Sequence, residues 1–150
     1  MPQSRLSPPP PVPAAPGAAG AASPAPVHRW PLAIVRTVAV LILVQVFLQA
    51  ALAGAFITGD VGLLGLHSAN GILLVLTTAA LLPATILLLR PGRGPWWPIA
   101  FSIVLWWLVA AQVGFGFGRQ VGLHIPLGVA IMSLISGFTW WSVLSREARP

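Results

Sequence analysis

Two histidines stand in similar surroundings in this sequence, and their chemistry is the easiest to define. His67 lies in "GLHSANG" and His124 in "GLHIPLG", so each is followed four residues later by a glycine, Gly71 or Gly128. In a helix, positions four apart share a face and are separated by about one turn, or about 5.4 Å. An imidazole can bind haem iron axially, and a missing side chain one turn deeper leaves room for a porphyrin against the backbone. The pattern predicts that the two histidines ligate one haem b.

Other interpretations of the histidines stay open at this point. A single histidine near a helix end usually lies at the membrane interface or makes a hydrogen bond to a neighbouring helix. A zinc or non-haem iron site is disfavoured, because the chain has no cysteine and the only carboxylate expected on the same side is Asp60. The matched surroundings of the two residues support haem, and the purely structural role stays open beside it.

Further side chains are expected close to the histidines. Arg119 would lie at the outer surface, where a guanidinium can pair with a haem propionate, and Phe115 and Phe117 would flank the porphyrin. Four uncharged polar residues fall within apolar segments: Gln45, Gln49, Asn70 and Gln112. Because such side chains are costly in lipid, we expect them to face the protein interior. They would join helices by hydrogen bonds or contact an imidazole N–H.

The composition identifies lipid as the solvent of most of the chain. Of its 150 residues, 57% are hydrophobic and 7% are charged, whereas about a quarter of the residues of a soluble domain are charged. A helix needs about 20 apolar residues to cross the hydrocarbon core. Four segments reach that length: residues 34–57, 64–89, 96–117 and 121–144. Their short connections predict an all-α integral membrane protein, an up-down-up-down four-helix bundle over residues 30–145.

The two halves of this bundle share a pattern that predicts an internal two-helix repeat. Each half reads glutamine (Gln49 or Gln112), small and aromatic residues, a short loop, Gly-Leu-His, three residues and glycine. Because both copies run in the same direction, a pseudo-two-fold axis along the membrane normal would relate them. The second and fourth segments would then be diagonal, about 12–14 Å apart, which suits two imidazoles with an iron between them.

The arginines predict the orientation of the bundle. All eight basic residues are arginines, and seven of them fall on one side of the predicted bundle, Arg119 being the exception. The positive-inside rule makes that side cytoplasmic, so both termini would face the cytoplasm from the inner (plasma) membrane. Five tryptophans fall at the same boundary, where an indole can bury its ring beside the headgroups: Trp30, Trp96, Trp97, Trp140 and Trp141.

The ends of the chain differ in composition from the four segments. Residues 1–29 are rich in proline and alanine and predict a disordered cytoplasmic tail, and residues 146–150 predict a short second one. The net charge of +6 comes without any run of basic residues, so nucleic acid is not an expected partner. The expected partners are the lipid bilayer and a redox or other membrane protein.

The two motifs together resemble one four-helix half of haem A synthase. The resemblance covers about Gln45 to Leu144 and rests on "LQAALAGAFITG" with "LHSANG" and on "AQVGFGFG" with "LHIPLG". It implies that His67 and His124 are axial haem ligands on the second and fourth helices. Cytochrome b561-type bundles and small four-helix bacterial membrane proteins look similar too.

Departures from the synthase pattern bear on catalysis. The catalytic half of the synthase carries a glutamate one turn before its second-helix histidine, and Leu64 occupies that position here. Ser68 replaces an arginine, and the outer-loop cysteine pair is missing. We therefore expect no oxidation of a haem methyl group and do not expect an enzyme. The sequence supports a small haem b protein for electron transfer or haem holding, or alternatively a cofactor-free membrane scaffold or assembly subunit.

Overall fold

Four long helices form the whole of the described fold. The computed structural model describes residues 29–145, so all but the last residue of the tail expected at residues 1–29, and the whole of the tail expected at 146–150, lie outside that range. The helices are α1 (Arg29–Ile57), α2 (Leu63–Leu89), α3 (Trp97–Phe117) and α4 (Val121–Leu144). Each is long and apolar enough to cross a membrane. The prediction of an all-α, membrane-spanning four-helix bundle is confirmed.

The first helix begins earlier than the apolar pattern predicts. Arg29, which the sequence placed in the tail, is the first residue of α1, and Pro31 lies in the first turn. Proline is tolerated there because the N–H groups of a first turn have no partner within the helix. The length of an apolar segment reflects only the part of a helix that would lie in lipid. It therefore underestimates the length of a helix that continues beyond the lipid.

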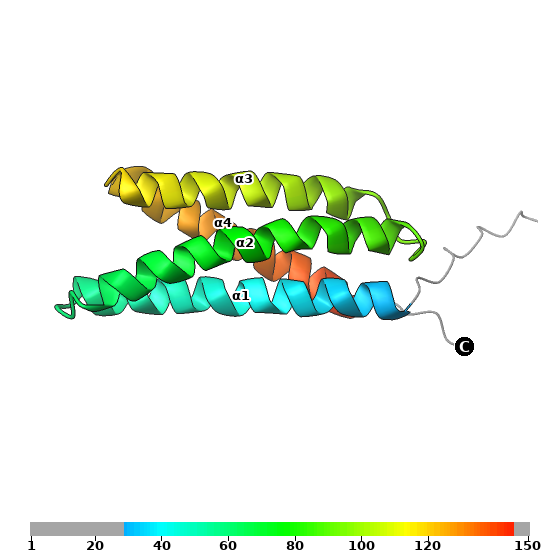
Figure 1. Cartoon of the computed structure of the whole chain (residues 1–150), viewed down its shortest axis with the longest axis horizontal. Helices are drawn as coiled ribbons and strands as arrows, with labels where there is room; N and C mark the ends of the chain where they lie inside the picture. Colours follow the sequence, from blue (N-terminus) through cyan, green and yellow to red (C-terminus); the bar gives the residue numbers. More distant parts are fainter. Residues whose placement is uncertain (1–28, 146–150) are drawn as a thin grey trace, which may run out of the picture.

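The helices form two hairpins that pack into a square. The helix pairs in contact are α1–α2, α2–α3, α3–α4 and α1–α4, whereas no Cα atoms of α2 and α4, or of α1 and α3, lie within 8 Å of each other. The expected diagonal placement of α2 and α4 is therefore confirmed. Figure 1 shows the tips of the two hairpins apart at one end, while α4 crosses behind towards α1 at the other.

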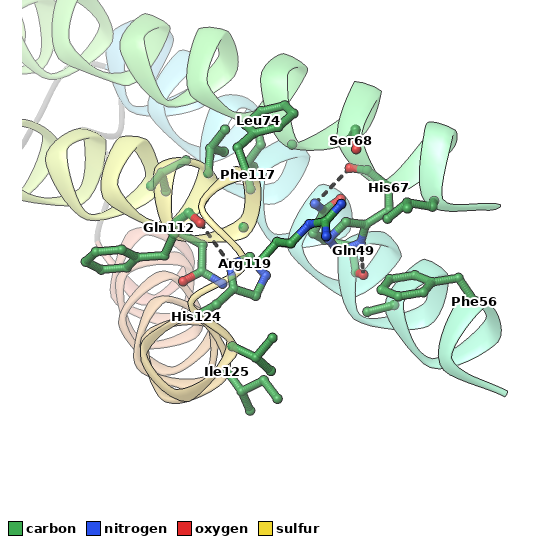
Figure 2. A pocket seen from close by; sticks show the side chains of 18 of the residues that line it. Gln49, Phe56, His67, Ser68, Leu74, Gln112, Phe117, Arg119, His124 and Ile125 are labelled. Carbon is green, nitrogen blue, oxygen red and sulfur yellow. Dashed lines mark hydrogen bonds between the residues drawn. The ribbon is translucent and has the colours of Figure 1, made fainter. Parts of the chain in front are cut away.

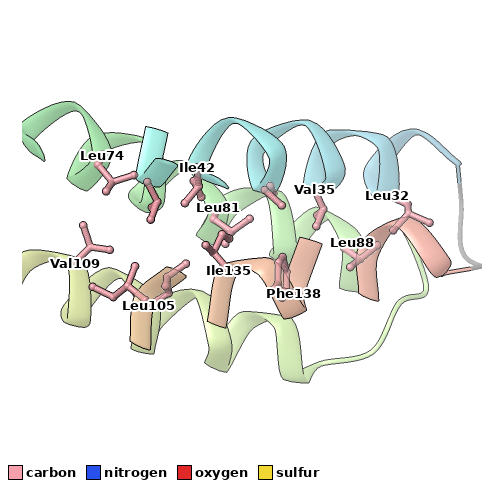
Figure 3. Packing of buried hydrophobic residues seen from close by; sticks show 14 residues of the cluster. Leu32, Val35, Ile42, Leu74, Leu81, Leu88, Leu105, Val109, Ile135 and Phe138 are labelled. Carbon is pink, nitrogen blue, oxygen red and sulfur yellow. The ribbon is translucent and has the colours of Figure 1, made fainter. Parts of the chain in front are cut away.

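The hydrophobic core fills only one half of this bundle (Figure 3). Its buried apolar residues reach no further than Val46 on α1 and Val109 on α3, and they begin at Leu74 on α2 and Ile131 on α4. We call this half, which holds the starts of α1 and α3, the closed end. The half with the loops at 58–62 and 118–120 is the open end, and no buried apolar residue lies there within residues 29–145.

Aromatic packing joins α3 to α4 at the closed end. The rings of Phe101 and Phe138 are stacked with centroids 4.3 Å apart, and those of Trp97 and Trp141 are 4.4 Å apart. Aromatic pairs at such separations add roughly 0.5–1.5 kcal/mol beyond the area that they bury. This cluster holds the two helices together far from the histidines.

Arg36 links α1 to the end of α4. Its Nε donates a hydrogen bond to the carbonyl oxygen of Ser142 (2.8 Å), and its Nη2 donates to those of Val143 (3.3 Å) and Ser145 (2.8 Å). The last carbonyls of a helix have no partner within the helix, and a cation there also interacts favourably with the helix dipole. A charged residue inside the predicted span is thus satisfied by the backbone of another helix.

Replacing Arg36 with methionine should therefore destabilise the bundle. Hydrogen bonds to charged groups contribute about 1.5–3 kcal/mol, so we expect a loss of this order in the free energy of unfolding, measured by denaturant titration in detergent micelles. Arg90 is exposed at the same end and serves as the control, because Arg90→Met removes the same charge without uncapping α4. Equal losses in the two variants would contradict a specific role for Arg36.

Candidate functional site

A cavity of about 570 Å³ lies at the open end, between the two hairpins. Side chains of all four helices line it, and they are mainly apolar and aromatic, including Phe56, Phe115 and Phe117. Both His67 and His124 reach into it, from α2 and α4 (Figure 2). Sites for small molecules and cofactors typically enclose about 300–1,000 Å³ and are lined mainly by apolar groups. The part of the bundle that lacks a core thus has the size and character of a ligand site.

The two imidazoles lie close together across this cavity. Their ring centroids are 6.2 Å apart and the ring planes are inclined by 58°. Two imidazole nitrogens that bind one metal ion from opposite sides, through bonds of about 2 Å, are about 4 Å apart, which separates the ring centres by roughly 6 Å. The structure therefore brings the two predicted ligands together at a spacing that suits one metal centre.

Hydrogen bonds to the backbone fix the tautomer of both rings. Nδ1 of His67 donates to the carbonyl oxygen of Gln49 (3.2 Å), and Nδ1 of His124 donates to that of Gln112 (2.8 Å). A carbonyl oxygen can only accept a hydrogen bond, so Nδ1 carries the proton in each ring and Nε2 keeps its lone pair. Neither Nε2 has a hydrogen-bond partner among the described residues, and each is therefore available as a ligand.

Polar side chains of α1 and α2 form a network behind His67. Asn70, only 8% exposed, donates to the carbonyl oxygen of Gln45 (3.0 Å) and to Oε1 of Gln49 (2.7 Å). The Nε2 of Gln49 in turn donates to the carbonyl oxygen of His67 (2.9 Å). The expectation that these side chains join helices is met for Gln49 and Asn70, whereas Gln45 contributes only its main-chain carbonyl and its Oε1 is buried without a partner. The imidazoles, however, are held by the main-chain carbonyls of the glutamines rather than by their side-chain amides.

The two glycines that follow the histidines lie against glutamine amides. A Cβ atom at Gly71 would lie 3.1 Å from Nε2 of Gln49, and one at Gly128 would lie 2.9 Å from Nε2 of Gln112. The room beside each glycine is thus filled by a side chain of the preceding helix, where the sequence suggested space for a porphyrin. Gly71 also lines the cavity, whereas Gly128 does not.

Both hairpins therefore contain the same arrangement of glutamine, histidine and glycine. In each one the glutamine carbonyl accepts from the histidine Nδ1, and the glutamine amide lies over the glycine one turn deeper. The halves differ in the residue three positions after the histidine. In the first half this residue is Asn70, which donates a hydrogen bond to the Gln49 amide oxygen. In the second half it is Leu127, which has no polar group to donate, and Oε1 of Gln112 is buried without a partner. The sequence repeat itself stays a prediction, but the local geometry is shared.

Arg119 provides the positive charge at the mouth of the cavity. It is an exposed residue of the loop between α3 and α4, with a left-handed backbone (φ 55°), and it lines the cavity. Figure 2 shows its side chain extending between the two histidines. Within residues 29–145 the Arg119 side chain makes no hydrogen bond or ion pair, so its guanidinium is available to an anionic group.

The cavity lining contains no carboxylate. Leu64 lines it with an apolar side chain. Within the described residues no group of three or more His, Cys, Asp or Glu side chains could hold a metal ion. The imidazole pair is thus the centre of any ligation at this site.

Sequence reasoning missed two features of the site. The first is Gly116, which lies directly against the ring of His124; it stands among other glycines in "GFGFG", and nothing in its spacing indicates this contact. The second is Phe56, whose ring meets that of His67 edge-on at 5.5 Å. Both contacts depend on how each loop places the following helix against the preceding one, which residue spacing does not specify.

Comparison of the chain with protein-family models, curated proteins and solved structures found no match.

Substitution of the two glycines should have unequal effects. At Gly71 a methyl group meets an amide that Asn70 and the His67 carbonyl hold in place, so we expect Gly71→Ala to cost about 1–3 kcal/mol in unfolding free energy, as overpacking does. The amide facing Gly128 is the end of a flexible side chain with no such anchor, and Gly128→Ala should cost less. Gly65→Ala, with nothing within 4 Å of the added methyl, is the control. Unfolding in detergent would reveal the order, and a larger loss for Gly128→Ala would contradict it.

Proposed function

We propose that this protein is a small membrane haem b protein in which His67 and His124 are the axial ligands, serving electron transfer or haem holding. The observation that carries the proposal is the imidazole pair: ring centres 6.2 Å apart, with both Nδ1 atoms bound to backbone carbonyls. A ligating histidine typically donates its other N–H to a carbonyl or carboxylate, which fixes the ring and raises its basicity. Both rings meet this condition before any ligand is present.

The rest of the cavity fits the same group. Its volume of about 570 Å³ and its apolar and aromatic walls suit a large flat ligand, and Arg119 at the mouth suits a carboxylate such as a haem propionate. When bound, haem would supply one-electron chemistry, and two imidazoles would leave its iron no open position. Leu64 supplies no acid or base, so the site favours holding the group and its electron over transforming a substrate.

The location of the site at the open end bears on possible partners. A single haem near one end of the bundle would exchange electrons, or haem itself, with a partner at the same side of the membrane. Phe117 and Val121 beside the mouth are 65% and 58% exposed and offer an apolar surface there. A redox or other membrane protein is therefore the partner class that we propose.

A second candidate function is a cofactor-free scaffold or assembly subunit. The observation that favours it is that each imidazole already joins two helices, through its Nδ1 bond to a glutamine carbonyl. Interhelical hydrogen bonds of this kind stabilise membrane bundles by about 0.6–2 kcal/mol. In the haem protein each Nε2 would bind iron, whereas in the scaffold it would bind no cofactor. The absorption spectrum of the purified protein distinguishes the two.

We further propose that the closed end faces the cytoplasm from the inner (plasma) membrane. Arg29, Arg36, Arg90 and Arg93 lie at this end of the described chain, and only Arg119 lies at the open end. An excess of arginine marks the cytoplasmic side of short-looped membrane proteins. The haem site would then lie near the outer face.

The haem proposal predicts a low-spin haem b spectrum with a sharp reduced α-band for protein purified in detergent, because two imidazoles make the iron six-coordinate. His67→Ala and His124→Ala should each abolish the spectrum or convert it to a high-spin form. His28→Ala, which changes the third histidine of the chain, is the matched control and should leave the spectrum unchanged. Colourless wild-type protein that also fails to take up added haem would overturn the proposal and favour the scaffold.

The orientation proposal predicts the location of fused reporters. Reporters at Met1 and Pro150 should both be active on the cytoplasmic side, and one inserted at Asp60, in the loop of the open end, on the opposite side. A variant in which Arg90 and Arg93 are replaced by glutamine and arginines are added beside Asp60 has less positive charge at the closed end and more at the open end. A smaller fraction of its molecules should insert in the proposed orientation. A periplasmic signal from either terminus of the unaltered chain would contradict the orientation.

A further inference from the structure

Gly116, the penultimate residue of α3, lies in direct contact with the imidazole of His124. A Cβ atom built at this position would lie 3.1 Å from Cε1, 3.3 Å from Nδ1 and 3.9 Å from Nε2 of that ring. The closest of these separations is tighter than nine in ten real Cβ contacts. With a methyl group at residue 116 the ring would have to move by a few tenths of an ångström, so its present position depends on the missing side chain.

The same face of α3 also holds the ring by a hydrogen bond. Gln112, whose carbonyl oxygen accepts from Nδ1 of His124 at 2.8 Å, lies four residues before Gly116 and so one turn away on the same face. One turn of α3 thus provides the imidazole with a hydrogen-bond acceptor at Gln112 and with space at Gly116. Together they determine both the distance and the tilt of the ring.

The other hairpin provides a natural comparison. The residue four positions after Gln49 is Ala53, which lines the cavity and carries the methyl group that Gly116 lacks. There the hydrogen bond from His67 Nδ1 to the Gln49 carbonyl is 3.2 Å long, against 2.8 Å for His124. The hairpin with glycine at this position therefore has the shorter hydrogen bond from its histidine to the preceding helix.

We propose that Gly116 is a positioning residue: by lacking a side chain it lets the His124 imidazole lie against α3 with Nδ1 bound to the Gln112 carbonyl and Nε2 directed into the cavity. The proposal extends the haem function proposed above, and only its consequence for haem binding rests on that function. The orientation of the ring is a property of the chain alone. His124 is then the more firmly fixed of the two ligands, and His67 the more adaptable.

The first test measures the ring in the ligand-free protein. In the full chain labelled with ¹⁵N-histidine, in detergent, the His124 signals are identified by their loss in His124→Ala. We expect the Nδ1–H tautomer with a slowly exchanging ring proton in wild type, and loss of that protection in Gly116→Ala. Gly114→Ala is the matched control, because it adds the same methyl to the same helix with nothing within 4 Å. Identical His124 signals in the two variants would overturn the proposal.

The second test measures haem binding by the same proteins. Residues that orient a ligating histidine typically change affinity by about 10–100-fold when replaced, so Gly116→Ala should weaken haem binding by at least about 10-fold, and Gly114→Ala should not. If wild type takes up no haem, the proposed function fails, while the ligand-free spectra still decide the role of Gly116.

A reverse variant covers the case in which Gly116→Ala does not fold. Ala53→Gly removes the methyl group at the position that corresponds to Gly116, four residues after Gln49, so the His67 ring should approach α1 more closely. We expect its Nδ1–H proton to exchange more slowly with water than in wild type, as that of His124 does. An unchanged exchange rate in a folded Ala53→Gly protein would overturn the proposal, because the missing side chain would then have no influence on the ring.

Discussion

The confinement of apolar packing to one half of the bundle determines the rest of this structure. Leu32, Ile42, Leu81 and Ile135, with the other core residues, pack between four helices at the closed end. No comparable core is found among the described residues at the open end, so the two hairpins separate there and leave a cavity. In a lipid environment this division is tolerable, because each helix already satisfies its own backbone hydrogen bonds without its neighbours.

Polar contacts replace apolar packing at the open end. Asn70 and Gln49 connect α1 to α2, and the Gln112 carbonyl connects α3 to α4 through His124. These contacts hold each hairpin together internally, yet none of them joins one hairpin to the other. The gap between the hairpins therefore persists, and the two imidazoles approach each other across it. A group that binds both rings would complete the link between the hairpins.

The same hydrogen bonds are compatible with both proposed functions, and this is a physical consequence of imidazole chemistry. Each ring has two nitrogens, and using Nδ1 to join helices is what prepares Nε2 as a ligand. A structural role explains the Nδ1 bond of each histidine separately, whereas the haem proposal also explains why the two rings lie 6.2 Å apart beside a cavity. The pairing of the rings, rather than their individual contacts, is what favours haem over a scaffold.

The sequence by itself determined the four helices and their antiparallel order. Hydrophobic length and short loops are local properties, so residues 121–144 could be delimited to the residue, while α1 extended five residues beyond its apolar pattern to Arg29. The diagonal placement of α2 and α4 followed from the loop lengths alone. Only the tertiary structure decided which groups meet between helices: the glutamine carbonyls on the imidazoles, the amides over Gly71 and Gly128, and the ring of His124 on Gly116. These contacts depend on the rotation and separation of neighbouring helices to within an ångström, which the packing of many side chains sets together and which no spacing along one helix encodes.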